Sequence, residues 1–136
     1  MKHIKSLLAP KLLFTAALLY TCFIAYGSLV NTGSLPKLDY AVSDKLIHAL
    51  SYFLLFIVWF FYLIFKSNKI FYFKKTTFLC VIVFCYGIVI EVLQGTVTTV
   101  READYYDVIA NGVGILFGCF VVILSKNKIL KLKNSI

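Results

Sequence analysis

Residues 76–95 read TTFLCVIVFCYGIVIEVLQG, an apolar run in which the single charged residue, Glu91, lies close to the end. Because a helix rises about 1.5 Å per residue, a run of this length matches the roughly 30 Å hydrocarbon core of a bilayer. Three more runs of similar length and composition occupy residues 12–30, 46–65 and 107–124. The sequence therefore predicts an all-α fold, a transmembrane bundle of four helices in which residues 1–136 form a single domain.

The acidic and basic residues are sorted to opposite ends of these runs. All 6 acidic residues lie in or next to the segments that follow the first and third runs. In contrast, 11 of the 14 basic residues lie before the first run, between the second and third, or after the fourth. Membrane proteins retain Lys and Arg on the cytoplasmic side. We therefore expect both termini and the basic tail, residues 125–136, to be cytoplasmic, and the acidic segments to lie on the outer side.

The composition excludes a soluble nucleic-acid-binding protein. Of the 136 residues, 61% are hydrophobic, which is more apolar side chain than a soluble core of this size could bury. The net charge of +8 comes from lysines that flank the apolar runs, whereas a DNA-binding surface needs basic residues side by side on a soluble face. We expect membrane lipids as partners, and no nucleic acid.

The first run could be read instead as a cleavable signal peptide. It stays apolar through Leu29 and Val30, however, and bulky Tyr20 and Tyr26 lie near the small residues that a peptidase would need. We expect this run to be retained as the first span.

Polar residues recur at helical spacing in three of the runs. In the fourth, the residues from Asp104 to Gly118 follow steps of 3, 4, 3 and 4 and share one helix face. The second and third runs carry similar faces, and all three faces become polar near the outer side. Unpaired polar groups in hydrocarbon are costly, so the pattern predicts one pocket at the outer leaflet. Its expected members are Asp44, Lys45, His48, Glu91, Gln94, Arg101, Asp104, Asp107 and Asn111.

Several of these residues also have a purely structural interpretation. Acidic residues at the start of a helix, as Asp44, Asp104 and Asp107 would be, cap free N–H groups and complement the helix dipole. Small residues let helix backbones approach closely, and we expect packing contacts at Gly87, Gly114 and Gly118. Through the face of Gly114 and Gly118, two copies could also pair as a homo-oligomer. Glu91 and His48 lie between apolar neighbours and have no capping role.

The order and spacing of the polar residues resemble the VanZ-like family of small bacterial membrane proteins. The residues concerned are Asp44-Lys45-x-x-His48, then Glu91-x-x-Gln94, then Arg101-x-x-Asp104-x-x-Asp107-x-x-x-Asn111-x-x-Gly114-x-x-x-Gly118. Residues 95–100 lack the proline that often precedes the family's arginine. The resemblance implies a multi-pass protein of the bacterial cytoplasmic (inner) membrane that acts on the cell envelope. It also implies a link to antibiotic resistance through lowered susceptibility to teicoplanin, but it implies no reaction.

Two classes of function remain open from the sequence. In the first, the pocket binds a lipid, a lipid-linked envelope intermediate or a lipophilic glycopeptide, with Lys45 and Arg101 attracting a phosphate or carboxylate group. In the second, the protein is a membrane-embedded hydrolase or transferase in which His48 or Glu91 acts as general base and Asp107 orients it or holds a divalent metal. The chain contains no HExxH motif, nucleophile elbow or paired metal-ligand spacing. The sequence therefore favours binding and assigns no metal or other cofactor.

Overall fold

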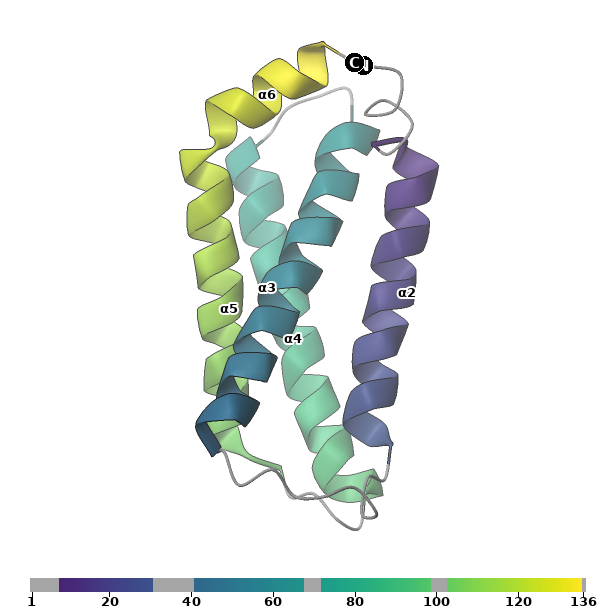
Figure 1. Cartoon of the computed structure of the whole chain (residues 1–136), viewed down its shortest axis with the longest axis vertical. Helices are drawn as coiled ribbons and strands as arrows, with labels where there is room; N and C mark the ends of the chain where they lie inside the picture. Colours follow the sequence, from purple (N-terminus) through teal and green to yellow (C-terminus); the bar gives the residue numbers. More distant parts are fainter. Residues whose placement is uncertain (1–7, 31–40, 68–71, 99–102, 136) are drawn as a thin grey trace.

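The computed structural model describes residues 8–30, 41–67, 72–98 and 103–135, and in this part of the chain every regular element is a helix. The helices are α2 (Pro10–Leu29), α3 (Ala41–Lys66), α4 (Tyr72–Val97), α5 (Tyr105–Leu124) and α6 (Lys126–Asn134). The first four run up and down alternately as an antiparallel bundle, and α2 begins at the same end at which α6 lies (Figure 1). The predicted all-α four-helix bundle is confirmed.

Four of the helices are long and apolar enough to cross a membrane, as expected of a multi-pass membrane protein. The spans are Pro10–Leu29, Asp44–Lys66, Phe73–Val97 and Tyr105–Leu124. Helices α3 and α4 have 26 residues each and exceed the predicted runs at both ends. The thickness of the hydrocarbon limits the apolar run but not the helix, which can continue among the polar headgroups. This extension adds Asp44 and Lys45 to α3.

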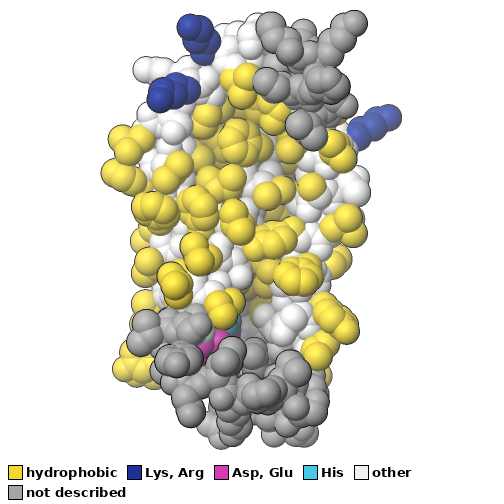
Figure 2. Space-filling view, viewed as in Figure 1, with side chains coloured by type: hydrophobic (Ala, Val, Ile, Leu, Met, Phe, Trp, Pro, Cys, Tyr) yellow, Lys and Arg dark blue, Asp and Glu magenta, His cyan; other side chains and the backbone are white. Residues whose placement is uncertain are grey.

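Helix α3 lies at the centre of the packing and contacts α2, α4 and α5. Its buried side chains Tyr52, Leu55, Phe56 and Phe60 form the middle of the core, which α4 and α5 complete with further apolar residues. Many other large apolar side chains of the bundle are exposed, and they cover the middle of the face seen in Figure 2. Such a belt suits contact with lipid chains.

The closest approach of two helices joins α3 to α5. A Cβ atom added at Gly114 would lie 2.0 Å from the backbone oxygen of Ala49, and one at Gly118 would lie 2.7 Å from the ring of Phe56. Glycine at these positions therefore sets the distance between the two helices. That distance in turn determines which polar groups of α3 can reach those of α5.

The two ends of the bundle differ in charge. We call the end at which α3 and α5 begin the acidic end, because Asp44, Glu91, Asp104 and Asp107 lie there. The opposite, basic end carries lysines of α3 and α4 together with α6, which crosses the end of the bundle at a steep angle (Figure 1). The sequence predicted a basic tail over 125–136, and most of this tail is helix α6, whose Ile129 is buried in the core.

Candidate functional site

Three helices contribute polar side chains to the acidic end. Helix α3 supplies Asp44, Lys45 and His48 from its first turns, α4 supplies Glu91 and Gln94 from its last turns, and α5 supplies Asp104, Asp107 and Asn111. Helical spacing of three or four residues places each set on one face of its helix. Four of these residues are nearly inaccessible, with exposed fractions of 3% for Glu91, 2% for Gln94, 6% for Asp107 and 1% for Asn111.

Lys45 ties α3 to the start of α5. Its ammonium group donates to Oδ2 of Asp104 and to Oδ1 of Asp107. Asp104 is also the N-cap of α5, because its Oδ1 accepts a hydrogen bond of 2.8 Å from the backbone N–H of Tyr106. The Lys45 ammonium, helped by this N–H group, holds the pKa of the Asp104 carboxyl below its usual range. The pair therefore fixes the register of the two helices at this end.

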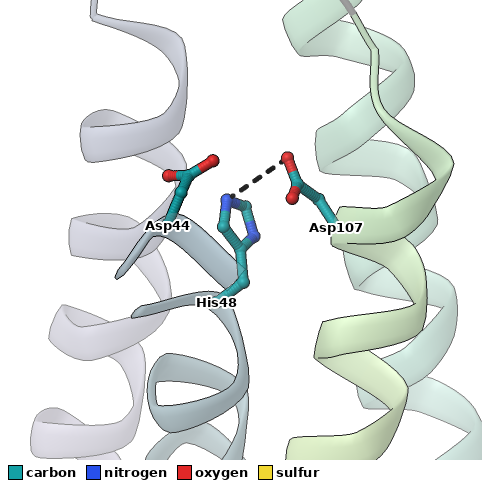
Figure 3. Close-up of side chains that lie close together, drawn as sticks. All are labelled: Asp44, His48 and Asp107. Carbon is teal, nitrogen blue, oxygen red and sulfur yellow. Dashed lines mark ion pairs between the residues drawn. The ribbon is translucent and has the colours of Figure 1, made fainter. Parts of the chain in front are cut away.

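His48 lies at the centre of the site. Its Nδ1 atom is 3.2 Å from Oδ1 of Asn111, and because an amide oxygen can only accept, Nδ1 donates this hydrogen bond. Oε1 of Glu91 is 3.7 Å from the same nitrogen. On the other side of the ring, Nε2 is 3.7 Å from Oδ2 of Asp107 (Figure 3). The imidazole therefore lies between a carboxylate of α4 and a carboxylate of α5.

Several buried polar atoms at the site have no hydrogen-bond partner within the described part of the chain. They are both carboxylate oxygens of Glu91, Nδ2 of Asn111 and the hydroxyl of Tyr52. A buried polar atom left unpaired costs about 1–3 kcal/mol. Without water or a ligand, these atoms would therefore destabilise the fold. Water or a ligand with matching donors and acceptors would remove this cost.

Tyr52 is a site residue that the sequence analysis did not assign. It lies four residues after His48 and therefore on the same face of α3, which is the signal that could have revealed it. A Cβ atom at Gly87 would be 3.0 Å from Cε1 of Tyr52 and 3.3 Å from Nδ2 of Asn111. Glycine at 87 therefore provides the space that these two polar side chains occupy.

Among the residues that the structure describes, negative charge exceeds positive charge at the site. Four carboxylates, those of Asp44, Glu91, Asp104 and Asp107, face one lysine and one imidazole. The ammonium of Lys45 is already bound by two of the carboxylates, and it is therefore not free to bind a phosphate group as the sequence suggested. Arg101, the other cation expected here, lies outside the described residues. The described side chains suit a cation or a hydrogen-bond donor better than an anion.

One set of three side chains could hold a metal ion. Asp44, His48 and Asp107 each offer one ligand atom, and these atoms all lie within 4.8 Å of one another. In Figure 3 the His48 ring lies between the two carboxylates, with Asp44 and His48 on α3 and Asp107 on α5. The sequence spacing alone did not indicate this set, because its members come from two helices that are distant in the chain.

The structure brings most of the expected site residues into one network of contacts. Its members are Lys45, His48, Glu91, Asp104, Asp107 and Asn111, with Asp44 beside His48. Gln94 is buried one turn after Glu91. Gly114 and Gly118 lie deeper in the bundle and contact α3 rather than the polar groups.

No model of a known protein family, no curated protein and no solved structure matches this chain.

Proposed function

We propose that this chain is a membrane protein that binds a lipid or a lipid-linked molecule, with the headgroup at the acidic end. The observation that supports this proposal most directly is the set of unpaired buried atoms on Glu91, Tyr52 and Asn111 around the imidazole of His48. Evolution retains such groups in a membrane interior where they contact one another or a ligand, because unpaired they only destabilise. A headgroup entering from the membrane surface would satisfy them.

The chemistry of the site favours a headgroup that donates hydrogen bonds. The oxygens of Glu91 and Asp107 can only accept when ionised, and Lys45 is held by Asp104 and Asp107. An amine or the hydroxyls of a sugar would fit these acceptors. A lipid-linked envelope intermediate or a lipophilic glycopeptide carries groups of this kind together with an apolar chain.

An apolar cavity of about 250 Å³ offers a place for the chain of such a ligand. It lies between α2, α3 and α4 and is lined by apolar side chains that include Leu55 and Val83. The polar atoms of the lining are paired with each other. The hydroxyl of Tyr86 donates to the backbone oxygen of Thr21 at 2.7 Å, and the indole N–H of Trp59 donates to the hydroxyl of Thr21 at 3.0 Å.

A pair of aromatic rings lies between the cavity and the polar site. Tyr86 lines the cavity, and the centroid of its ring is 6.3 Å from that of Tyr52, whose hydroxyl is among the unpaired atoms. Tyr86 and Glu91 are five residues apart on α4, about 7 Å along the helix. One amphiphile could therefore span both regions.

We extend the proposal to the family and its location. The ordered pattern from Asp44 to Gly118 supports membership of the VanZ-like family, and the sorted charges support a cytoplasmic membrane in which the acidic end faces outward. A role in envelope maintenance or in lowered teicoplanin susceptibility would follow from these two assignments. Both roles are tested by the phenotype of the site variants described below.

A second candidate function is catalysis on the same lipid-linked molecule. The hydrogen bond from Nδ1 of His48 to Asn111 leaves Nε2 facing the carboxylate of Asp107. An imidazole whose Nδ1–H is held by an oxygen acceptor can use Nε2 as a general base. Release of a cleaved or transferred product from lipid extracts by the purified protein, but not by Asp107→Asn, would favour catalysis over binding.

The test of the binding function is the lipid that purifies with the protein. Wild type and Glu91→Gln, an isosteric change that removes the charge, are purified in mild detergent, and the bound lipids are identified by mass spectrometry. We expect one species to be enriched with wild type and lost with Glu91→Gln and His48→Ala. Val92→Ala, at the exposed neighbouring position on α4, is the matched control and should retain the species.

The level of folded protein separates a binding role from a structural one. We expect the two site variants to accumulate in the membrane as wild type does while the envelope or teicoplanin phenotype is lost. Equal retention of the same lipids by wild type, Glu91→Gln and His48→Ala would contradict the proposal.

A further inference from the structure

Asp44, His48 and Asp107 point into one small space at the acidic end (Figure 3). The distance of 3.7 Å between Nε2 of His48 and Oδ2 of Asp107 is too long for a hydrogen bond. Two ligand atoms, each about 2.0–2.2 Å from a zinc ion, lie about 3.4 Å apart in tetrahedral geometry and at most about 4.2 Å apart. The His48–Asp107 pair already has the spacing of two ligands on one ion, and a small rotation of Asp44 would add a third.

We propose that Asp44, His48 and Asp107 bind a divalent transition-metal ion of the zinc type. This inference goes beyond lipid binding and does not require it. Imidazole and carboxylate together suit zinc and neighbouring first-row ions. Three protein ligands leave a coordination position open, to which water or an oxygen of a headgroup could bind.

The surroundings of His48 resemble those of a metal-bound histidine. Such a ring usually donates its second N–H to an amide, carbonyl or carboxylate oxygen, which fixes the tautomer and the ring orientation. Here Nδ1 donates to Oδ1 of Asn111 at 3.2 Å, and Nε2 faces Oδ2 of Asp107. The ring is already oriented as a ligand.

Glu91 provides an independent indication of a bound cation. Its carboxylate is 3% exposed, lies 3.7 Å from Nδ1 of His48, and has no hydrogen-bond partner among the residues that the structure describes. A dication bound at Nε2 would draw electron density from the ring and make its Nδ1 side more positive. The positive ring would then stabilise the buried carboxylate of Glu91.

The charges of the site leave room for a dication. If the imidazole is neutral, the negative charge of the described carboxylates exceeds the single positive charge of Lys45. These carboxylates belong to Asp44, Glu91, Asp104 and Asp107. The two oxygens of Asp107 can serve both cations, because Lys45 contacts Oδ1 while Oδ2 faces His48. Binding of the ion therefore does not require the Lys45 contact to break.

The test measures metal directly on the full chain, purified in detergent without a polyhistidine tag and treated with a chelator. Zn²⁺ is added, excess is removed, and bound zinc is counted by elemental mass spectrometry. Co²⁺ then replaces Zn²⁺ so that the visible absorption reports the ligands and geometry. We expect one ion per chain, with a nitrogen and oxygen spectrum that lacks the strong absorption of a cobalt–thiolate bond, since the chain also has four cysteines.

Variants test whether the ion binds at His48 and Asp107. His48→Gln and Asp107→Asn should weaken zinc binding by more than about tenfold, and Asn111→Ala, which removes the partner of the ring, by about 10- to 100-fold. His3→Ala changes the only other histidine of the chain and should leave binding unchanged. Circular dichroism and gel filtration verify that each variant is folded.

Wild type supplies a readout that needs no variant, because a bound ion should raise its melting temperature, and the rise should continue with the logarithm of the free-ion concentration. Binding that survives in folded His48→Gln, a thiolate spectrum, or no retained zinc in wild type would overturn the proposal. Lipid retention is measured separately. Failure of the lipid-binding proposal would therefore leave the metal proposal intact, and failure of the metal proposal would leave lipid binding intact.

Discussion

Glu91 illustrates how a single residue can be costly to the fold and valuable to the function. Its carboxylate is buried beside His48 from α3, and neither of its oxygens has a hydrogen-bond partner within the described residues. An apolar side chain of similar volume would remove this cost. Retention of a costly group at a pocket is expected where binding, rather than stability, requires it.

The first prediction concerns this residue. In delipidated, chelator-treated protein, Glu91→Leu should raise the free energy of unfolding by about 1–3 kcal/mol, because no unpaired carboxylate remains in the interior. The same variant should retain none of the lipid that purifies with wild type. Thermal or denaturant unfolding in detergent measures the first effect. Destabilisation by Glu91→Leu would show instead that the carboxylate holds the helices together.

At the scale of the helix, the crossing of α3 and α5 controls the geometry of the site. Gly114 of α5 lies against the backbone of Ala49 of α3. Ala49 directly follows His48 in the chain, and Gly114 comes three residues after Asn111. The hydrogen bond of 3.2 Å between His48 and Asn111 therefore lies next to the point of closest approach. A change in helix separation there should lengthen this bond directly.

The second prediction follows from that packing. Gly114→Ala should destabilise the protein by at least about 1–3 kcal/mol, because the new methyl group would overlap the backbone of α3. It should also weaken ligand binding although no polar group is removed. Gly27→Ala is the matched control, since an added Cβ at Gly27 has no atom within 4 Å, and it should stabilise α2 by about 0.5–1 kcal/mol. Equal effects of the two changes on the melting temperature would contradict this account.

The whole molecule is polarised between its acidic and basic ends. Lysines of α6 and of the ends of α3 and α4 lie at one end, and the carboxylates lie at the other (Figure 2). Lysines attract anionic lipid by about 1 kcal/mol each near the membrane surface. The orientation should therefore place the basic end against the cytoplasmic leaflet and the polar site at the outer leaflet.

The third prediction tests this orientation. With the four native cysteines replaced, Tyr105→Cys at the acidic end should react with a membrane-impermeant thiol reagent in intact cells. Ser135→Cys at the basic end should react only after the cells are permeabilised. Labelling of Ser135→Cys alone in intact cells would reverse the topology and place the site on the cytoplasmic side.

Local sequence patterns were sufficient to predict the number of spans and the faces that carry polar residues. The length of an apolar run is set by bilayer thickness, and a spacing of three or four residues defines a helix face whatever the helix packs against. The steps from Asp104 to Gly118 therefore predicted one face of α5. The helix ends were less predictable, as α3 shows, because a helix can continue beyond the hydrocarbon.

Contacts between helices were decided only by the tertiary structure. Sequence spacing does not set the separation or rotation of two helices, which here depend on the packing of Gly114 against Ala49. The sequence thus could not reveal that Asp104 and Asp107 bind the ammonium of Lys45. By itself it determined a four-span polarised bundle, because solvation by lipid acts on each segment separately. The partners of His48 depended on the fold, because they come from α4 and α5, far away in the chain.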